Sequence, residues 1–98
     1  MAIDIELKRA FKTGTVEIGI KDTEKSILFG KSKGIIMSND ALTNDKLRLK
    51  NFCEISKIPF VIVEYVPIEF GKIIGLAYPV SAVSIINEGK SKILSELA

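Results

Sequence analysis

Histidine and tryptophan are absent from this 98-residue sequence, and cysteine occurs once, at Cys53. Histidine is the commonest general base and the commonest metal ligand, so its absence argues against most classes of enzyme. A single cysteine cannot form a disulfide within the chain, and nothing in the sequence requires an oxidising compartment. The acidic residues of the first quarter show no metal-ligand spacing. We therefore expect no enzyme, no metal site and no cofactor.

Long apolar runs are also missing. No stretch approaches the roughly 20 residues that cross a bilayer, so no membrane partner is expected. The first twelve residues alternate acids and bases and lack the apolar segment of a signal peptide, which indicates a cytoplasmic protein. The net charge is only +2, so any nucleic acid must be bound at a compact site rather than through bulk charge.

The residues that are present describe a small α/β protein. Four short strand-like runs occur at residues 15–18, 34–38, 60–65 and 82–86. The second and third are continuously apolar, as in strands that are buried on both faces. Helical segments are expected at residues 5–12, 23–29, 45–57, 68–74 and 90–97. This alternation predicts one domain over residues 1–98, folded as a three-layer α/β/α sandwich with a four-stranded mixed sheet.

Gly30-Lys31-Ser32 is the most enzyme-like string in the chain, because it ends like a phosphate-binding loop. That loop needs an earlier glycine where Lys25 stands, a strand before it and a helix after it. Here a helix precedes the string and a strand follows it. We therefore interpret it as a glycine that ends a helix, followed by solvated lysines, and not as the site of a nucleotide enzyme.

The segment Gly19–Lys25 is more informative. A strand ends at the glycine, and a helix is expected to begin at Asp22 or Thr23. The free N–H groups and the positive dipole at a helix start favour a phosphate, and Lys21 and Lys25 add cationic donors. Asp22 has the chemistry to accept a hydrogen bond from a guanine edge. The alternative is that Asp22 only caps the helix and the lysines are solvated.

The segment between residues 75 and 81 is unusually apolar for a loop, with Leu76, Tyr78, Pro79 and Val80. An exposed apolar loop is usually a contact surface, and an aromatic side chain suits stacking on an unpaired base. The loop could equally be tucked into the core. The sequence pattern leaves both interpretations open.

These two segments and the order of elements resemble the kink-turn-binding ribosomal proteins of archaea and eukaryotes. The nearest branch is the L30e family of the large ribosomal subunit, with L7Ae as its sister. The resemblance covers nearly the whole chain and is strongest at residues 13–14, 19–21, 30–36 and 68–94. It implies binding to a kink-turn, a sharply bent internal loop in RNA, by a protein that has ribosomal RNA and other ribosomal proteins as partners and is a monomer when isolated.

The resemblance also assigns the RNA-binding residues. They are Gly19, Ile20, Lys21, Asp22, Lys25, Asn39, Leu76, Ala77, Tyr78, Pro79, Val80 and Ser81. Two positions depart from the L30e pattern. Asp22 follows Lys21 where a small residue is usual, which is closer to L7Ae, and Pro79 replaces a basic residue of some members. The alternative function is therefore an L7Ae-like general kink-turn binder in RNA-modification particles.

Overall fold

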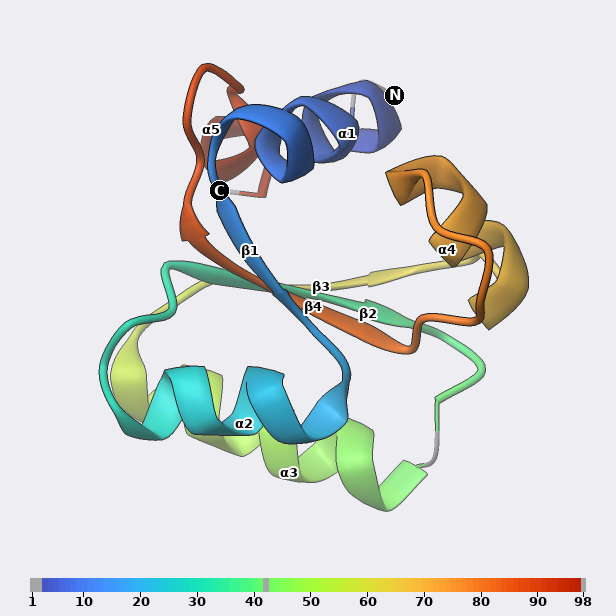
Figure 1. Cartoon of the computed structure of the whole chain (residues 1–98). Helices are drawn as coiled ribbons and strands as arrows, with labels where there is room; N and C mark the ends of the chain where they lie inside the picture. Colours follow the sequence, from blue (N-terminus) through green and yellow to red (C-terminus); the bar gives the residue numbers. More distant parts are fainter. Residues whose placement is uncertain (1–2, 42, 98) are drawn as a thin grey trace.

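The computed structural model describes residues 3–41 and 43–97, in which helices cover both faces of one sheet (Figure 1). The strands are β1 (Thr15–Ile18), β2 (Gly34–Ser38), β3 (Phe60–Val63) and β4 (Ala82–Asn87). The helices are α1 (Ile3–Thr13), α2 (Ile20–Leu28), α3 (Thr43–Ser56), α4 (Pro67–Ile74) and α5 (Ile93–Leu97). Helices α1, α4 and α5 lie on one face, and α2 and α3 on the other. The predicted three-layer fold is confirmed.

The sheet has the strand order β1-β4-β2-β3. Strands β2 and β3 are parallel, whereas β4 is antiparallel to both β1 and β2, so the sheet is mixed as predicted. All five residues of the central strand β2 are buried. Strand β3 lies at an edge, and Ile62 is 41% exposed. The expected burial on both faces is therefore confirmed for β2 and wrong for β3.

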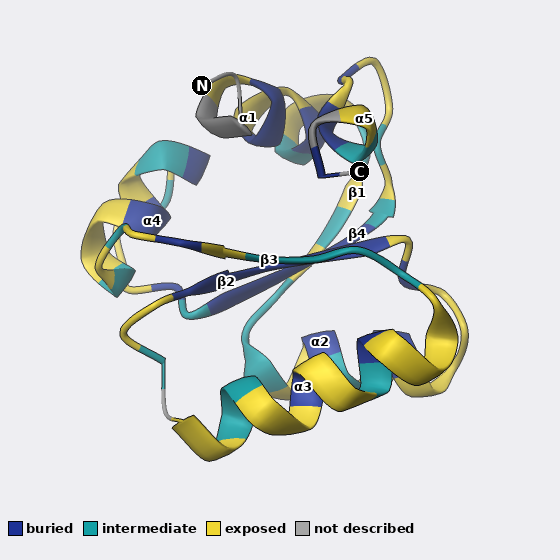
Figure 2. Cartoon of the chain, turned by 180° about the vertical axis from the view of Figure 1, so that it is seen from behind, coloured by how far each residue is buried: buried dark blue, intermediate teal, exposed yellow. Residues whose placement is uncertain are grey.

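Alternate residues of the central strands supply two separate cores, as the pleat of a strand requires. Ile36 points into the first core, which lies between the sheet and helices α1, α4 and α5, and Phe70 there is 1% exposed. Ile35 and Met37 point into the second core, between the sheet and helices α2 and α3. Full burial of a side chain such as Phe70 stabilises the fold by about 1.5–3 kcal/mol. Figure 2 shows that the buried residues concentrate on the strands and on the inner faces of the helices.

Cys53 lies on the buried face of α3, in the core between α2, α3 and the sheet, and is 1% exposed. Burial raises the pKa of its thiol to about 11. The sulfur is therefore protonated near neutral pH, and a protonated thiol is a poor nucleophile. The expectation that Cys53 serves as a small buried hydrophobic residue is confirmed.

The helix ends show how local chemistry sets the boundaries. Gly75 ends α4 with φ 101°, a left-handed conformation that favours glycine, and its N–H donates to the carbonyl of Gly71 at 3.0 Å. The last helix begins at Ile93, later than predicted. Its expected first turn is a loop instead: the N–H of Leu94, which would donate to the carbonyl of Lys90 in a helix that began there, donates to Glu88 Oε2 at 3.2 Å. No helix in residues 3–41 and 43–97 is long and apolar enough to cross a bilayer.

Candidate functional site

One end of the sheet gathers the two segments that the sequence singled out. Strands β1 and β2 end there, and the antiparallel strand β4 begins there. The N–H of Gly19 donates to the carbonyl of Ala82 at 2.9 Å, and the N–H of Ser38 donates to the carbonyl of Ser81 at 2.8 Å. Asn39 follows Ser38 directly. The predicted residues Gly19, Ser81 and Asn39 therefore lie along the same end of the sheet.

Gly19 makes the turn from β1 into α2. Its φ of 100° and ψ of 156° are open to glycine and strained for other residues. Its carbonyl accepts the N–H of Thr23 at 3.0 Å, so the helix begins at Ile20. Asp22 therefore lies within the first turn, and the prediction that it caps the helix is wrong. No side chain caps α2, which leaves N–H groups at its start available to an anion.

Three charged side chains near the start of α2 project into solvent. Lys21, Asp22 and Lys25 are exposed, and none of them forms an ion pair within the described part of the chain. Arg48 on the adjacent helix differs, because its guanidinium lies 3.1 Å from Glu24 and 2.9 Å from Asp45. Lys21 in the first turn of α2 and Lys25 one turn later are therefore available to a ligand, whereas Arg48 is already paired.

Some residues of the loop after α4 are buried in the core, and others are exposed. Leu76 and Val80 pack into the first core, and Val80 is 1% exposed. The N–H of Leu76 donates to the carbonyl of Gly71 at 2.8 Å, and that of Val80 to Pro67 at 2.9 Å. The exposed residues of the loop are Ala77, Tyr78 and Pro79. The loop is therefore tucked into the core at Leu76 and Val80 and exposed at the three residues between them.

Tyr78 is the large side chain that this loop displays, at 53% exposed. Its backbone lies against α4, because a Cβ atom at Gly71 would collide with the carbonyl oxygen of Tyr78. The loop leads directly into β4, beside the turn at Gly19. The start of α2 and the loop therefore occupy the same end of the molecule, one on each side of the sheet (Figure 1).

The remaining predicted residues extend this end toward the edge strand β3. Asn39 is exposed, and its side-chain amide donates to Glu64 at 3.3 Å. Its backbone carbonyl accepts a hydrogen bond from Lys46 at 3.0 Å. Ile20 is half-buried and packs against the second core, so it anchors the helix start from below.

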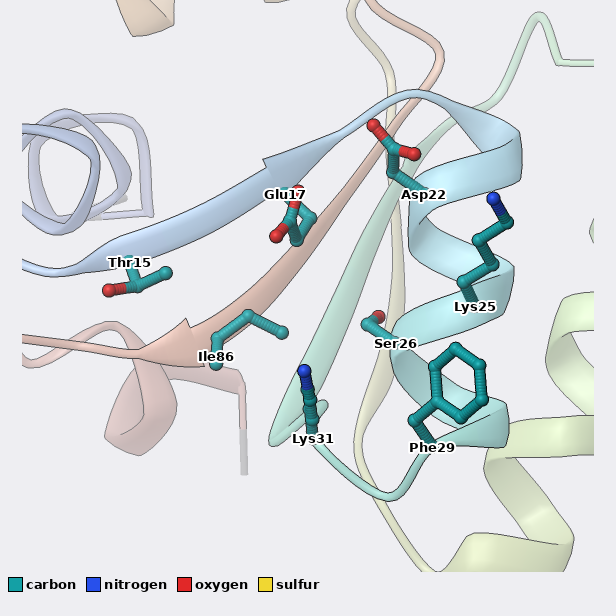
Figure 3. A pocket seen from close by; sticks show the side chains of 8 residues that line it. All are labelled: Thr15, Glu17, Asp22, Lys25, Ser26, Phe29, Lys31 and Ile86. Carbon is teal, nitrogen blue, oxygen red and sulfur yellow. The ribbon is translucent and has the colours of Figure 1, made fainter.

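A hollow of about 320 Å³ lies next to the start of α2, between α2 and the edge strand β1 (Figure 3). It brings Asp22 and Lys25 together with three residues that the sequence did not single out as ligand-binding: Glu17, Phe29 and Lys31. The alternation of β1 predicts which residues share a face with Glu17. It does not predict that α2 packs against that face, which only the folded structure shows. Among the described residues, no group of three or more acidic or cysteine side chains is placed to hold a metal ion.

The string Gly30-Lys31-Ser32 forms no phosphate cradle. Ser32 is 8% exposed, and its Oγ lies 2.8 Å from Ser84 Oγ beneath the sheet. Gly30 has φ 70° and follows the end of α2, as predicted. The geometry agrees with a turn that ends a helix, and it leaves Lys31 exposed beside the hollow.

Comparisons with known proteins identify relatives over almost the whole chain. The model of the family described as "Ribosomal protein L7Ae/L30e/S12e/Gadd45 family" matches residues 1–95. The protein "Large ribosomal subunit protein eL30" of Sulfolobus acidocaldarius is 34% identical over 89 residues, which cover 91% of this chain and 86% of that protein. The protein of the same name from Methanothermobacter thermautotrophicus is 32% identical over 94 residues, 96% of each chain.

The "Large ribosomal subunit protein eL30" of Aeropyrum pernix is 26% identical over 96 residues, which cover 98% of this chain and 96% of that protein. These matches confirm the resemblance on which the sequence analysis rested. Ribosomal proteins of this family are not enzymes, so the expectation of a non-catalytic protein is confirmed by its relatives.

Proposed function

Since the chain belongs to the ribosomal protein L7Ae/L30e/S12e/Gadd45 family, we propose that it is a structural protein of the large ribosomal subunit that binds and stabilises a kink-turn in RNA. Its partners are then ribosomal RNA and neighbouring ribosomal proteins, and its location is the cytoplasmic ribosome. The observation that supports this most directly is the pairing of two different surfaces at one end of the sheet.

The start of α2 supplies the polar part of the RNA contact. The uncapped N–H groups and the helix dipole attract a phosphate, and Lys21 and Lys25 strengthen that attraction. Asp22 is exposed and has no capping role, so its carboxylate is available to accept an N–H of a guanine edge. Together, these groups form hydrogen bonds to a base edge and bind the adjacent RNA phosphate.

The loop after α4 supplies the apolar part. Tyr78 is exposed while Leu76 and Val80 anchor the loop beneath it, so the ring is presented on a rigid support. Stacking of a base on an aromatic ring contributes about 1–3 kcal/mol. Only an unstacked base can use this surface, and a sharply bent internal loop presents such a base whereas a regular helix hides it.

The protein then stabilises the bend by binding the bent RNA better than the straight RNA. Such differential affinity moves the conformational equilibrium of the RNA toward the kink and needs no chemical step. A compact surface of this kind also agrees with the net charge of +2, which is too small for general coating of phosphates.

The test is a comparison of two RNAs by fluorescence anisotropy at fixed, moderate salt. One RNA carries a kink-turn, and the other is a duplex of equal length in which the internal loop has been replaced by paired bases. We expect tight binding to the first and weak, strongly salt-dependent binding to the second. Equal affinity for the two would reject the proposal.

A second candidate function is that of a general kink-turn binder in RNA-modification particles. The position of Asp22 favours it, because an exposed acid in the first turn of α2, with Lys25 three residues later, is the L7Ae-like arrangement noted in the sequence. Immunoprecipitation separates the two functions. Recovery of large-subunit RNA supports the ribosomal role, whereas guide RNAs in the absence of ribosomal RNA support the second one.

A further inference from the structure

Strand β3 forms an edge of the sheet, and its outer side has no partner strand. In the order β1-β4-β2-β3, β2 is its neighbour among the described strands, and Figure 2 is drawn from the side of this edge. The carbonyls of Pro59 and Val63 accept hydrogen bonds from β2 and from the residue that follows it, at 3.0 and 2.9 Å. Successive backbone groups of a strand point to opposite sides, so the N–H and C=O groups of Phe60 and Ile62 point away from β2. Such outward groups can pair with a further strand.

Beside this edge, between β3 and α3, lies an apolar hollow that we call the β3 groove. It is lined by Thr43, Lys46, Leu47, Lys50, Phe60 and Ile62. Leu47 is 55% exposed and Ile62 is 41% exposed, so the groove presents two large apolar side chains to solvent. Its volume of about 250 Å³ falls below the range of small-molecule sites, about 300–1,000 Å³. The groove therefore suits side chains of a larger partner.

The charge that lines the β3 groove is positive. Lys46 and Lys50 contribute it, and neither forms an ion pair in the described part of the chain. Lys46 donates to the carbonyl of Asn39 at 3.0 Å, which holds the ammonium group in place without neutralising it. The acid that follows β3, Glu64, is outside the lining and accepts the Asn39 amide at 3.3 Å. A partner that carries carboxylates beside apolar side chains therefore complements the groove.

The two edge strands of the sheet differ in how they discourage further pairing. Both are four residues long, so length does not distinguish them. Strand β1 carries Glu17, and its register is irregular between Thr15 and Val16. A charge and an irregular register are devices that keep other strands from an edge, as are lysine and proline. Residues 60–63 read Phe-Val-Ile-Val and contain no such residue, so β3 is the edge left open to a partner.

We propose that the β3 edge binds an extended acidic segment of another protein as a fifth strand of the sheet. The outward backbone groups of Phe60 and Ile62 pair with the segment. An apolar side chain of the segment fills the β3 groove against Leu47, and a carboxylate on the same face lies near Lys50. RNA is the less suitable occupant, because it has no strand backbone to pair with these N–H and C=O groups. The proposal does not depend on RNA binding, and its test uses the protein alone with peptides.

The test is a titration of the 15N-labelled protein with the synthetic peptide Leu-Thr-Glu-Thr-Leu-Thr-Glu-Thr, followed by NMR. Its alternation places leucine and glutamate on one face of a strand, as the groove requires. We expect amide shifts at residues 60–63 and slower hydrogen exchange at Phe60 and Ile62. In one control peptide lysine replaces both glutamates, and in the other the backbone nitrogens are methylated, so that no ladder can form. Each control should bind at least about threefold more weakly.

Two variants test the edge and the charge separately. Ile62→Glu places a carboxylate on the edge and should abolish binding of the acidic peptide. Its matched control is Ile68→Glu, because Ile68 is 42% exposed on α4 and does not line the groove. Lys50→Glu should reverse the preference, so that the lysine peptide binds about threefold more tightly than the acidic one. Since Lys50 is exposed, this variant tests the proposal even if Ile62→Glu does not fold.

Five results would overturn the inference. Three concern the peptides: no binding at millimolar concentration, equal affinity for the acidic and lysine peptides, and equal affinity for the methylated peptide. Dimerisation in sedimentation experiments that protects the Phe60 and Ile62 amides without peptide would assign the edge to a second copy of the chain. Displacement of the peptide by a straight RNA duplex would assign the groove to RNA. Peptide binding without kink-turn binding contradicts only the proposed function, and the reverse result contradicts only this inference.

Discussion

The two ends of the sheet differ in how far their polar groups are paired within the chain. At the end where β4 finishes, the polar groups are paired within the chain: Thr13 Oγ1 accepts the N–H of Lys90 at 3.0 Å, and the side chain of Asn87 accepts that of Gly89 at 2.8 Å. At the other end, Lys21, Asp22 and Lys25 are exposed and form no ion pair among the described residues, although Asn39 there donates to Glu64 at 3.3 Å. The first end is therefore held together by hydrogen bonds within the chain, and the second end is the one that we propose to contact RNA.

Gly14 and Gly19, one at each end of the sheet, also differ in how closely other atoms approach them. A Cβ atom at Gly14 would collide with the carbonyl of Asn87 and would come within 2.8 Å of the backbone of Glu88 and Gly89. A Cβ atom at Gly19 would meet nothing within 4 Å. Gly14 is therefore required by packing inside the protein, whereas the space in front of Gly19 is open to a ligand that approaches the backbone.

The largest effect is expected from Gly14→Ala. Because the colliding atoms belong to the backbone, they cannot move aside as a flexible side chain would. We expect a loss of about 3 kcal/mol or more in the free energy of unfolding. Urea denaturation followed by circular dichroism measures it, and a loss below about 1 kcal/mol would show that this end is less tightly packed than described.

Gly19→Ala is the matched variant at the other end. The positive φ should cost about 1–2 kcal/mol of stability, less than the change at Gly14. Affinity for a kink-turn RNA should fall in addition, because the new methyl group projects into the space that the RNA backbone needs. An affinity equal to that of the unmodified protein would mean that no ligand approaches this turn.

Tyr78→Ala should weaken kink-turn binding by about 1–3 kcal/mol through lost stacking. The free energy of unfolding of this variant should change little, because the ring of Tyr78 lies largely outside the core. Isothermal calorimetry and thermal unfolding measure the two quantities on the same sample. The matched control is Ile55→Ala, since Ile55 is 78% exposed on α3 and belongs to neither RNA-binding segment. A drop in stability without a drop in affinity would assign Tyr78 to the fold.

Lys21→Ala should weaken binding by about 1 kcal/mol or somewhat more and lower the slope of log affinity against log salt by about one. Its physical cause is the loss of one phosphate contact at the start of α2. Lys12→Ala, in the last turn of α1, provides the control with the same change of charge. An unchanged salt slope in Lys21→Ala would contradict a phosphate contact there.

The smallest effect is expected from Asp22→Ala. Removal of a true N-cap costs about 0.5–2 kcal/mol of stability, but Asp22 lies inside the first turn and caps nothing. We expect the free energy of unfolding to change by less than about 0.5 kcal/mol, while affinity for the kink-turn decreases. A larger loss of stability would restore the structural role that the sequence suggested for this residue.

The sequence was sufficient for the order and type of the elements, because their signals are local. The bounds of β2 agree with the predicted run at residues 34–38, since glycine and polar residues limit a short apolar segment. The start of α2 was misplaced because Asp22 has a strong preference for the cap position. In the folded chain Ile20 packs into the core, and the helix begins directly after Gly19.

Features that depend on strand order could not be predicted. The exposure of Ile62 follows from the edge position of β3, which no local pattern reports. The hollow beside α2 likewise requires β1 to lie next to β4. The most specific block of the resemblance, residues 68–94, spans both ends of the sheet, because it contains the loop around Tyr78 as well as the turn at Gly89. The block therefore identifies the family but does not separate the residues of the proposed binding surface from those that stabilise the fold.

The most direct test of a single RNA-binding end is an NMR titration of the 15N-labelled protein with a kink-turn RNA. We expect the largest amide shifts at Gly19–Lys25 and at the exposed loop residues around Tyr78, and little change at Gly14 and Gly89. Shifts in only one of the two segments, or shifts centred on the Gly14 end, would contradict the account.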